Sequence, residues 1–214
     1  MVRPELANSN ATQNLACVCP LRSQPEVDAL IALFSSIAHE EGWQPDGQLD
    51  TYRDRSTYFG LRHTGTLTER PTLIGGLQLV CLRYVEAPPS HAVWPDVAVG
   101  IDAAHIAVLA VEKAWRGKSG GLFWLLAVEM WRYCVGAGVR ELWLEATPRT
   151  LQCYQRLGWP LHIRGELRMH WGEPCYLCSM EVREVAGSLV ERALKSASYR
   201  GILELAVAAR PEKV

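Results

Sequence analysis

Residues 105–131 have the sequence HIAVLAV-EKAW-RGKSGG-LFWLLAVEMW. The first seven form a nearly continuous apolar run, typical of a strand buried on both faces. The glycine-rich turn that follows precedes a strongly apolar stretch, 120–134, which indicates a helix. A helix start leaves about four backbone N–H groups unpaired, and glycines let an anion approach them closely. The turn from Arg116 to Gly121 therefore predicts a site for an anion such as pyrophosphate.

Other ligand-binding turns share this strand–glycines–helix order, so the pattern has rivals. The chain has no G-x-G-x-x-G, which weighs against a dinucleotide-binding turn. Gly117-Lys118-Ser119 lacks the upstream glycine of a Walker A loop. A further alternative is a helix capped by Ser119 that binds no ligand.

The rest of the chain predicts a mixed sheet with helices on its faces, an α/β (α+β) fold. Pro45 to Asp54 is expected to be a loop over the substrate side, and Val85 to Val97 a flexible insertion with an exposed Trp94. We divide the chain into a disordered arm (1–14), one domain (15–183), and a C-terminal helix and tail (184–214). The expected strands are 15–21, 57–62, 73–84, 104–111, 139–146, 161–168 and 175–182, and the expected helices are 23–42, 120–134, 148–157 and 183–208.

Composition narrows the class of protein. The 214 residues are 49% hydrophobic and 21% charged, as in an ordinary soluble domain. The net charge of -1 shows no excess of basic residues of the kind that nucleic-acid binding requires. No apolar run reaches the ~18 residues of a transmembrane segment, and the N-terminus lacks a secretory apolar stretch. A reducing, cytoplasmic location is the simplest expectation for the seven cysteines.

Two cysteine pairs raise the alternative of a zinc site. Cys17-Val-Cys19 and Cys175-Tyr-Leu-Cys178 together supply four thiols. However, residues three apart on a strand point to opposite faces, and small buried cysteines are common in cores. We therefore expect no metal.

The turn resembles motif A of the GNAT acyltransferase superfamily, V-x-x-x-x-R/Q-x-x-G-x-G/A. The matching residues are Val111, Arg116, Ser119 (in place of the first glycine) and Gly121. Cys153 to Trp159, CYQRLGW, resembles the family's x-Y-x-x-x-G-F segment. The resemblance implies a GNAT-type mixed, mostly antiparallel sheet flanked by helices, here with an extra C-terminal helix. It also implies an acyl thioester donor, gripped by its phosphopantetheine arm.

Three other segments resemble bacterial N-acyl amino acid synthases, which are relatives of the autoinducer (acyl-homoserine lactone) synthases. They are Leu49 to Ser56, Glu145 to Arg149, and Gly165 to Tyr176. By resemblance, such enzymes move an acyl group from acyl carrier protein to an amine. The autoinducer synthases have E-x-x-R where this chain has His105-Ile-Ala-Val108, and an arginine where it has Gln78. We therefore expect an acceptor other than the one that homoserine-lactone synthesis requires.

Acyl transfer to an amine needs a base, an acid and an oxyanion donor. His105 occupies the position of a glutamate in many GNAT members, and an imidazole accepts a proton near neutral pH. A structural, hydrogen-bonded histidine is the alternative. Tyr154 matches the tyrosine that protonates the leaving thiolate; a tyrosine packed on the sheet is the alternative. The backbone from Leu109 to Val111 is expected near the thioester carbonyl.

Other residues are candidates for binding. Arg149 suits a carrier phosphate or a substrate carboxylate, and Asp50 and Asp54 suit an acceptor ammonium, although solvated side chains are the alternative for all three. The donor-binding residues are expected to be Leu109, Val111, Arg116, Gly117, Lys118, Ser119, Gly120 and Gly121. The large apolar residues that either line an acyl pocket or fill the core are Trp124, Trp131, Trp143 and Trp159.

The sequence thus predicts an N-acyltransferase that uses an acyl-carrier-protein or CoA thioester and a small amine, with an amino acid favoured. Transfer is expected to be direct, because no cysteine is placed as a nucleophile. One alternative is an acetyl-CoA-dependent N-acetyltransferase. Another is a GNAT domain that binds an acyl carrier without catalysis.

Overall fold

A computed structural model describes residues 16–45, 47–63, 71–116 and 121–207. Its strands are β1 (Ala16–Leu21), β2 (Ser56–His63), β3 (Thr72–Cys81), β4 (Ala103–Val111), β5 (Glu141–Ala146), β6 (His162–His170) and β7 (Glu173–Glu181). Its α-helices are α2 (Gln24–Glu41), α3 (Gln48–Thr51), α4 (Gly121–Gly136), α5 (Pro148–Leu157), α6 (Val182–Lys195) and α7 (Ala197–Val207). The predicted arm 1–14, the last residue of the predicted C-terminal helix (208) and the predicted tail 209–214 lie outside the described residues.

The strands form one seven-stranded sheet in the order β1-β2-β3-β4-β5-β7-β6. Every neighbouring pair is antiparallel except β4 and β5, which are parallel. The predicted mixed, mostly antiparallel sheet flanked by helices is therefore confirmed. The two cysteine pairs considered for zinc lie on β1 and β7, with β2, β3, β4 and β5 between them, so they cannot form one site.

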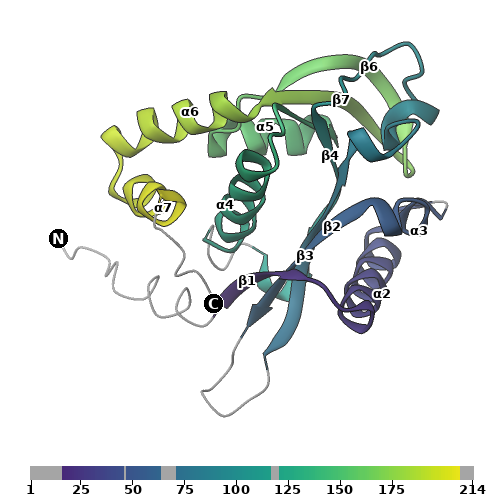
Figure 1. Cartoon of the computed structure of the whole chain (residues 1–214), viewed down its shortest axis with the longest axis horizontal. Coiled ribbons are helices and arrows are strands. Elements are labelled where there is room, and N and C mark those ends of the chain that lie inside the picture. The colour runs from purple at the N-terminus through teal and green to yellow at the C-terminus, as the bar shows by residue number, and fades with distance from the viewer. Residues whose placement is uncertain (1–15, 46, 64–70, 117–120, 208–214) are drawn as a thin grey trace.

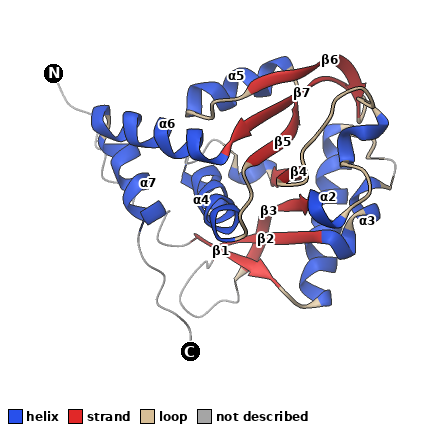
Figure 2. Ribbon diagram, turned by 45° about the horizontal axis from the view of Figure 1, so that its top comes forward, coloured by secondary structure: helices blue, strands red, loops and turns tan. Residues whose placement is uncertain are grey.

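Helices cover both faces of the sheet (Figure 1). On one face, Leu30, Phe34 and Ile37 of α2 pack against buried residues of β2 and β4. On the other face, α4 and α5 pack against the central strands, and Leu126 and Met130 belong to the main core. Helices α6 and α7 lie outside α4, away from the sheet centre (Figure 2). The central strands are thus buried on both sides, as their apolar sequences require.

The sequence encodes the helix ends clearly. Ser23 and Glu26 form a capping box at the start of α2, and Gly42 ends the helix in the left-handed conformation, with φ of 74°. Thr147 caps α5 by accepting a hydrogen bond from the Thr150 backbone N–H, and Gly158 ends that helix with φ of 103°. These ends agree with the prediction to within two residues.

The C-terminal segment differs from the prediction of one helix over 183–208. It forms two helices, α6 and α7, separated at Ser196, whose backbone is extended with φ of -144° and ψ of 127°. The break lets α7 fold back so that Ile202 and Leu203 pack against Val128 of α4. One continuous amphipathic helix could not reach α4 with its last turns.

The segment 85–97 was predicted to be a flexible insertion with an exposed Trp94, which is wrong. The Trp94 side chain is only 1% exposed. Its indole N–H donates to the Glu166 backbone oxygen at 2.8 Å. Its ring lies against Gly165, where an added Cβ would come within 2.5 Å of Trp94 Cδ1. The tryptophan therefore fixes this segment to β6. The predicted loop 45–54 also contains short helical turns, α3 and Arg53–Arg55.

No helix in the described ranges is long and apolar enough to cross a membrane.

Candidate active site

The candidate site lies where β4 and β5 part. Their parallel pairing covers only Ala103 to His105 against Glu141 to Trp143. Just beyond it, the register between β3 and β4 shifts, since Gln78 pairs with Val108 but Leu79 pairs with Ile106. Ala107 is thus an extra residue, and such a bulge bends a strand. The bend leaves the β5-facing edge of β4 from Ile106 onward without a partner strand among the described residues.

A cleft of about 190 Å³ occupies this opening. Its walls come from β4, β5, the start of α5, the β6–β7 turn and the loop after α2. The lining residues are Trp43, Ile106, Ala107, Val108, Leu109, Leu144, Glu145, Thr147, Thr150, Tyr154, His170, Trp171, Glu173 and Cys175. Its charged side chains, Glu145 and Glu173, are both acidic.

Glu145 and His105 form a buried pair at the base of the cleft. His105 Nε2 lies 2.9 Å from Glu145 Oε2, and their side chains are 0% and 8% exposed. Burial alone would raise the pKa of the Glu145 carboxyl, but the adjacent His105, with a smaller contribution from His170, holds that pKa below its usual value. Glu145 lines the cleft, whereas His105 lies behind it. His105 therefore reaches the cleft through Glu145.

A smaller cavity of about 10 Å³ adjoins the cleft. Gln78 Nε2 donates to Ser56 Oγ at 3.0 Å and to the Tyr58 hydroxyl at 3.2 Å. These bonds orient the amide, and its Oε1 is buried without a hydrogen-bond partner among the described residues. Glu145 Oε1 is in the same condition. Both residues line the small cavity, so each contributes one unpaired acceptor to its lining residues.

Tyr154 lines the same cleft from α5. Its ring stacks on Trp159 with centroids 5.0 Å apart and on Phe123 at 5.8 Å. Although part of the side chain is open to the cleft, its crowded, low-polarity surroundings raise the pKa of Tyr154 to about 12. The phenol therefore keeps its proton at neutral pH, as a general acid must.

Cys175 also lines the cleft. Burial, together with the charge of Glu145, raises the pKa of its thiol to about 12. Because the thiolate is the nucleophilic form, Cys175 is inert as a nucleophile at neutral pH.

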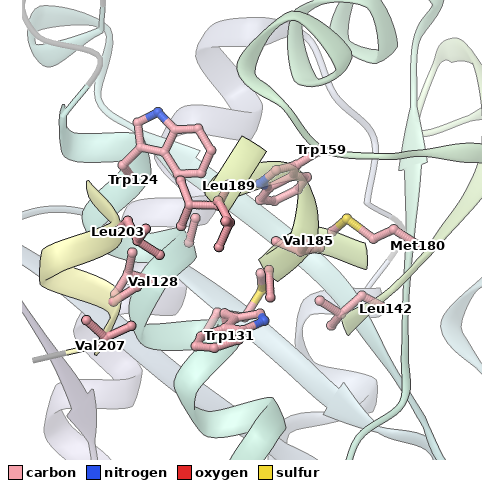
Figure 3. A pocket seen from close by; sticks show the side chains of 15 residues that line it. Trp124, Val128, Trp131, Leu142, Trp159, Met180, Val185, Leu189, Leu203 and Val207 are labelled. Atoms are coloured by element: carbon pink, nitrogen blue, oxygen red, sulfur yellow. The ribbon is translucent and has the colours of Figure 1, made fainter. Parts of the chain in front are cut away.

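A second, apolar cavity of about 140 Å³ lies between α4, α6, α7 and the sheet. Figure 3 shows Trp124, Trp131 and Trp159 around it, with Leu189 of α6 and Leu203 of α7 closing the outer side. Trp143, predicted with these tryptophans, packs instead in the separate cluster that contains Trp94. Leu142 lines the cavity and Leu144, two residues along the same strand, lines the cleft.

The structure brings some predicted residues to the cleft and leaves others away from it. Leu109 and Tyr154 line the cleft. Asp50 is exposed and pairs with Arg53 at 3.4 Å. Asp54 lines a different depression, next to Tyr133. Arg149, in the first turn of α5, is exposed and is not part of the cleft lining.

The predicted anion-binding turn is described only in part. Arg116 Nε donates to the Val111 backbone oxygen at 2.6 Å, and Arg116 Nη1 contacts Glu41 Oε1 at 2.5 Å. Gly121 is the first residue of α4. Gly117, Lys118, Ser119 and Gly120 lie outside the described residues, so their predicted role in donor binding stays a prediction.

Among the cleft residues that sequence reasoning missed are Glu145 as a chemical group, Glu173, His170 and Trp171. One signal was present, because Glu145 is the acidic residue inside the apolar run Leu142 to Ala146. Burying such a charge is costly unless it is paired or used. No local pattern joins it to His170, since the β6–β7 hairpin brings that residue from 25 positions away (145 to 170).

Comparisons with known proteins bear on the fold. No family model matches the chain, and no curated protein matches it in sequence. Among solved structures, FeeM, an N-acyl amino acid synthase from uncultured soil microbes, matches with a TM-score of 0.68 and 15% identity, over 83% of this chain and 96% of that one. A CoA-dependent acyl-homoserine lactone synthase, BjaI, solved with SAM and isopentyl-CoA, matches with a TM-score of 0.60 and 15% identity, over 82% and 89%.

An N-acetyltransferase described as putative, from Lactobacillus plantarum, matches with a TM-score of 0.57 and 17% identity, over 79% of this chain and 99% of that one. At these identities the likeness shows the fold. The predicted resemblance to GNAT acyltransferases, including the N-acyl amino acid and autoinducer synthases, is confirmed at that level.

Proposed function

We propose that this protein is an N-acyltransferase that moves an acyl group from a thioester, carried by CoA or acyl carrier protein, to the amine of a small molecule. One observation carries the proposal. The opening between β4 and β5 brings into one cleft a strand edge with no partner strand among the described residues, the buried Glu145 carboxylate and the protonated Tyr154 phenol. Acyl transfer to an amine requires a proton acceptor, a proton donor and hydrogen-bond donors for the oxyanion, and these three groups can fill those roles.

The acceptor enters as an ammonium ion held by the Glu145 carboxylate, and it must lose one proton before it can attack. Because the pKa of Glu145 is lowered, this carboxylate passes the proton on to solvent and does not keep it. The acceptor nitrogen then attacks the thioester carbonyl carbon. We assign the stabilisation of the oxyanion to backbone N–H groups along β4, near Leu109 to Val111. His105 was predicted to be the base. In this proposal it acts indirectly, as the hydrogen-bonded partner of Glu145.

When the intermediate collapses, the C–S bond breaks and the C–N amide bond remains. The departing thiolate takes the Tyr154 hydroxyl proton, and the second proton of the amine returns to the phenolate. The products are an amide and a free thiol, and one proton passes to solvent through Glu145. Since the Cys175 thiol stays protonated, transfer is direct, without an acyl-enzyme.

The apolar cavity supports a donor with more than an acetyl group. A dry cavity of about 150 Å³ holds a molecule the size of benzene, so ~140 Å³ suits an acyl tail of about six carbons. The two spaces are neighbours along β5, where Leu142 lines the cavity and Leu144 lines the cleft. This favours a medium or long acyl chain over the acetyl group of the alternative acetyltransferase.

The test is a thiol-release assay on the purified full chain. Octanoyl-CoA, octanoyl carrier protein and acetyl-CoA are each supplied with a panel of amines, and amide formation is followed by mass spectrometry. We expect amide and thiol in equal amounts, with octanoyl donors preferred over acetyl-CoA. Comparing the two octanoyl donors identifies the carrier.

Two outcomes would replace the proposal. Turnover of acetyl-CoA with no use of octanoyl donors would establish the acetyltransferase alternative. Tight binding of an acyl carrier with no thiol released, for any amine, would establish the non-catalytic alternative.

A further inference from the structure

The charged side chains that line the cleft favour a cationic acceptor. Its two charged side chains, Glu145 and Glu173, are carboxylates, and neither makes an ion pair with an arginine or lysine in the described part of the chain. The cleft and the adjoining small cavity have no Arg or Lys among their described lining residues. An acceptor that carries a carboxylate would therefore meet the like charge of Glu173, and of Glu145 with its His105 neighbour, with no arginine or lysine among the described lining residues to offset it.

The small cavity matches an amine nitrogen in size and in hydrogen bonding. About 10 Å³ is the room of one water-sized group. Gln78 Oε1 and Glu145 Oε1, both buried and unpaired among the described residues, are acceptors only, so they call for a group with several N–H donors. A primary ammonium has three. A buried acceptor without a partner is costly, which makes this pair informative.

Aromatic side chains beside the small cavity also favour a cation. Trp171 lines both the cleft and the small cavity, with His170 stacked on it at 5.2 Å and Trp43 at 6.4 Å. Burial lowers the pKa of His170, only partly offset by Glu145, so its ring is neutral at pH 7 and adds no positive charge. Indole faces attract cations.

The backbone holds Trp171 in this place at a cost. Trp171 has φ of 51° and Gly172 has φ of 86°, in a two-residue hairpin turn between paired His170 and Glu173. Such turns favour Asn-Gly, because a bulky residue at positive φ is strained. A tryptophan kept at a strained position beside a cleft points to a role in the site.

We infer that the acceptor is a primary amine that carries no carboxylate, bound with its nitrogen between Glu145 and Gln78 and its carbon skeleton against Trp171. The inference rests on the proposed N-acyltransferase function and narrows its acceptor, away from the amino acid favoured by the sequence. It also assigns a role to Gln78, because this chain has an uncharged acceptor at the position where the resemblance to autoinducer synthases implied an arginine.

The test compares amino acids with their decarboxylated counterparts in the same assay: phenylalanine with phenethylamine, and leucine with 3-methylbutylamine. We expect kcat/KM to be about a hundredfold or more higher for each amine than for its parent amino acid, because the described lining residues include no arginine or lysine to pair with the carboxylate. Equal or better use of the amino acids would overturn the inference while leaving the N-acyltransferase function intact.

Variants sharpen the same comparison. Glu173→Gln should reduce the preference for amine over amino acid by about tenfold, since it removes one repelling charge. Glu40→Gln, at an exposed position on α2 outside the cleft lining, should leave the preference unchanged. An unchanged preference in Glu173→Gln would remove Glu173 from the explanation and count against the inference.

Binding without a donor separates this inference from the catalytic proposal. Calorimetry with phenethylamine should show binding to the wild type and, because Gln78→Met removes one acceptor of the ammonium, binding to that variant weaker by about tenfold or more. Thermal unfolding checks that the variant folds. If amide formation fails with every acceptor but this binding pattern holds, the catalytic proposal fails alone. If phenylalanine binds as well as phenethylamine, the inference fails.

Discussion

The cleft and the apolar cavity lie close together but differ in what they offer a ligand. The cleft between β4 and β5 contains Glu145, Tyr154 and an unpaired strand edge. The cavity under α4, α6 and α7 is lined by three tryptophans and aliphatic side chains (Figure 3). The difference indicates a division of labour. Changes in the cleft should alter the chemical step, and changes in the cavity should alter the choice of acyl chain.

The largest expected effect is on the cleft side. Glu145→Gln keeps the size of the side chain but removes its charge and its ability to relay a proton, so turnover should fall by about 10²- to 10⁴-fold. The KM for the acyl donor should stay within about threefold, because Glu145 meets the acceptor rather than the donor. Steady-state kinetics at about pH 7.5 measures both. A fall in donor affinity with unchanged turnover would move Glu145 out of the chemical role.

A smaller loss is expected for the acid. Tyr154→Phe should lower turnover by about 10²-fold, the low end for general acid–base groups, since a thiolate is a good leaving group. Because the pKa of Tyr154 is raised to about 12, the wild type should not lose activity through tyrosine ionisation between pH 7 and pH 10. A pH–rate profile checks this. A fall in wild-type activity near pH 9 that is absent in Tyr154→Phe would contradict it.

The cavity side predicts a change of selectivity. Val185→Phe should fill part of the cavity and lower kcat/KM for octanoyl donors by about 10- to 200-fold, with little change for acetyl-CoA. Val135→Phe, at a position of α4 that is 52% exposed, is the matched control. Equal losses for octanoyl and acetyl donors in Val185→Phe would show that the cavity is core packing and that the division of labour is wrong.

The smallest effect concerns stability. The pKa of Glu145 is lower in the folded protein than its ordinary value of about 4.3, so its contribution to the free energy of unfolding is present above that pH. As the pH falls through the folded pKa, that contribution is lost. Urea unfolding should show the wild type losing stability relative to Glu145→Gln between about pH 5 and pH 3. Parallel pH curves for the two proteins would exclude a coupled His105–Glu145 pair.

The fold was largely predictable from the sequence because its signals are local. Alternating or continuous apolar runs mark the strands, and Ser23, Gly42 and Gly158 mark helix ends. The break at Ser196 was not predictable, because 183–208 has one helical pattern, and only packing on α4 decides where it folds back. The prediction that Trp94 is exposed was wrong for the same reason, since its contact Gly165 lies far along the chain.

The candidate site was predictable only in part. Tyr154 and Leu109 were found because they lie in contiguous segments that resemble known motifs. Glu145 pairs with His105, which lies 40 positions away, and shares a cavity with Gln78, which lies 67 positions away (105 to 145, 78 to 145). These residues lie on strands whose register a sequence pattern does not specify. Asp50 and Asp54 were chosen for their charge, and the structure turns both away from the cleft.

The most direct test of the central claim, that this cleft joins an acyl group to an amine, is the mass of the product from one reaction. Purified protein, octanoyl-CoA or octanoyl carrier protein, and phenethylamine are incubated together, and amide and free thiol are both quantified. We predict N-octanoyl phenethylamine in a one-to-one ratio with thiol, and the loss of both with Glu145→Gln. Thiol release accompanied by free octanoic acid and no amide would contradict the account, because the acyl group would then pass to water.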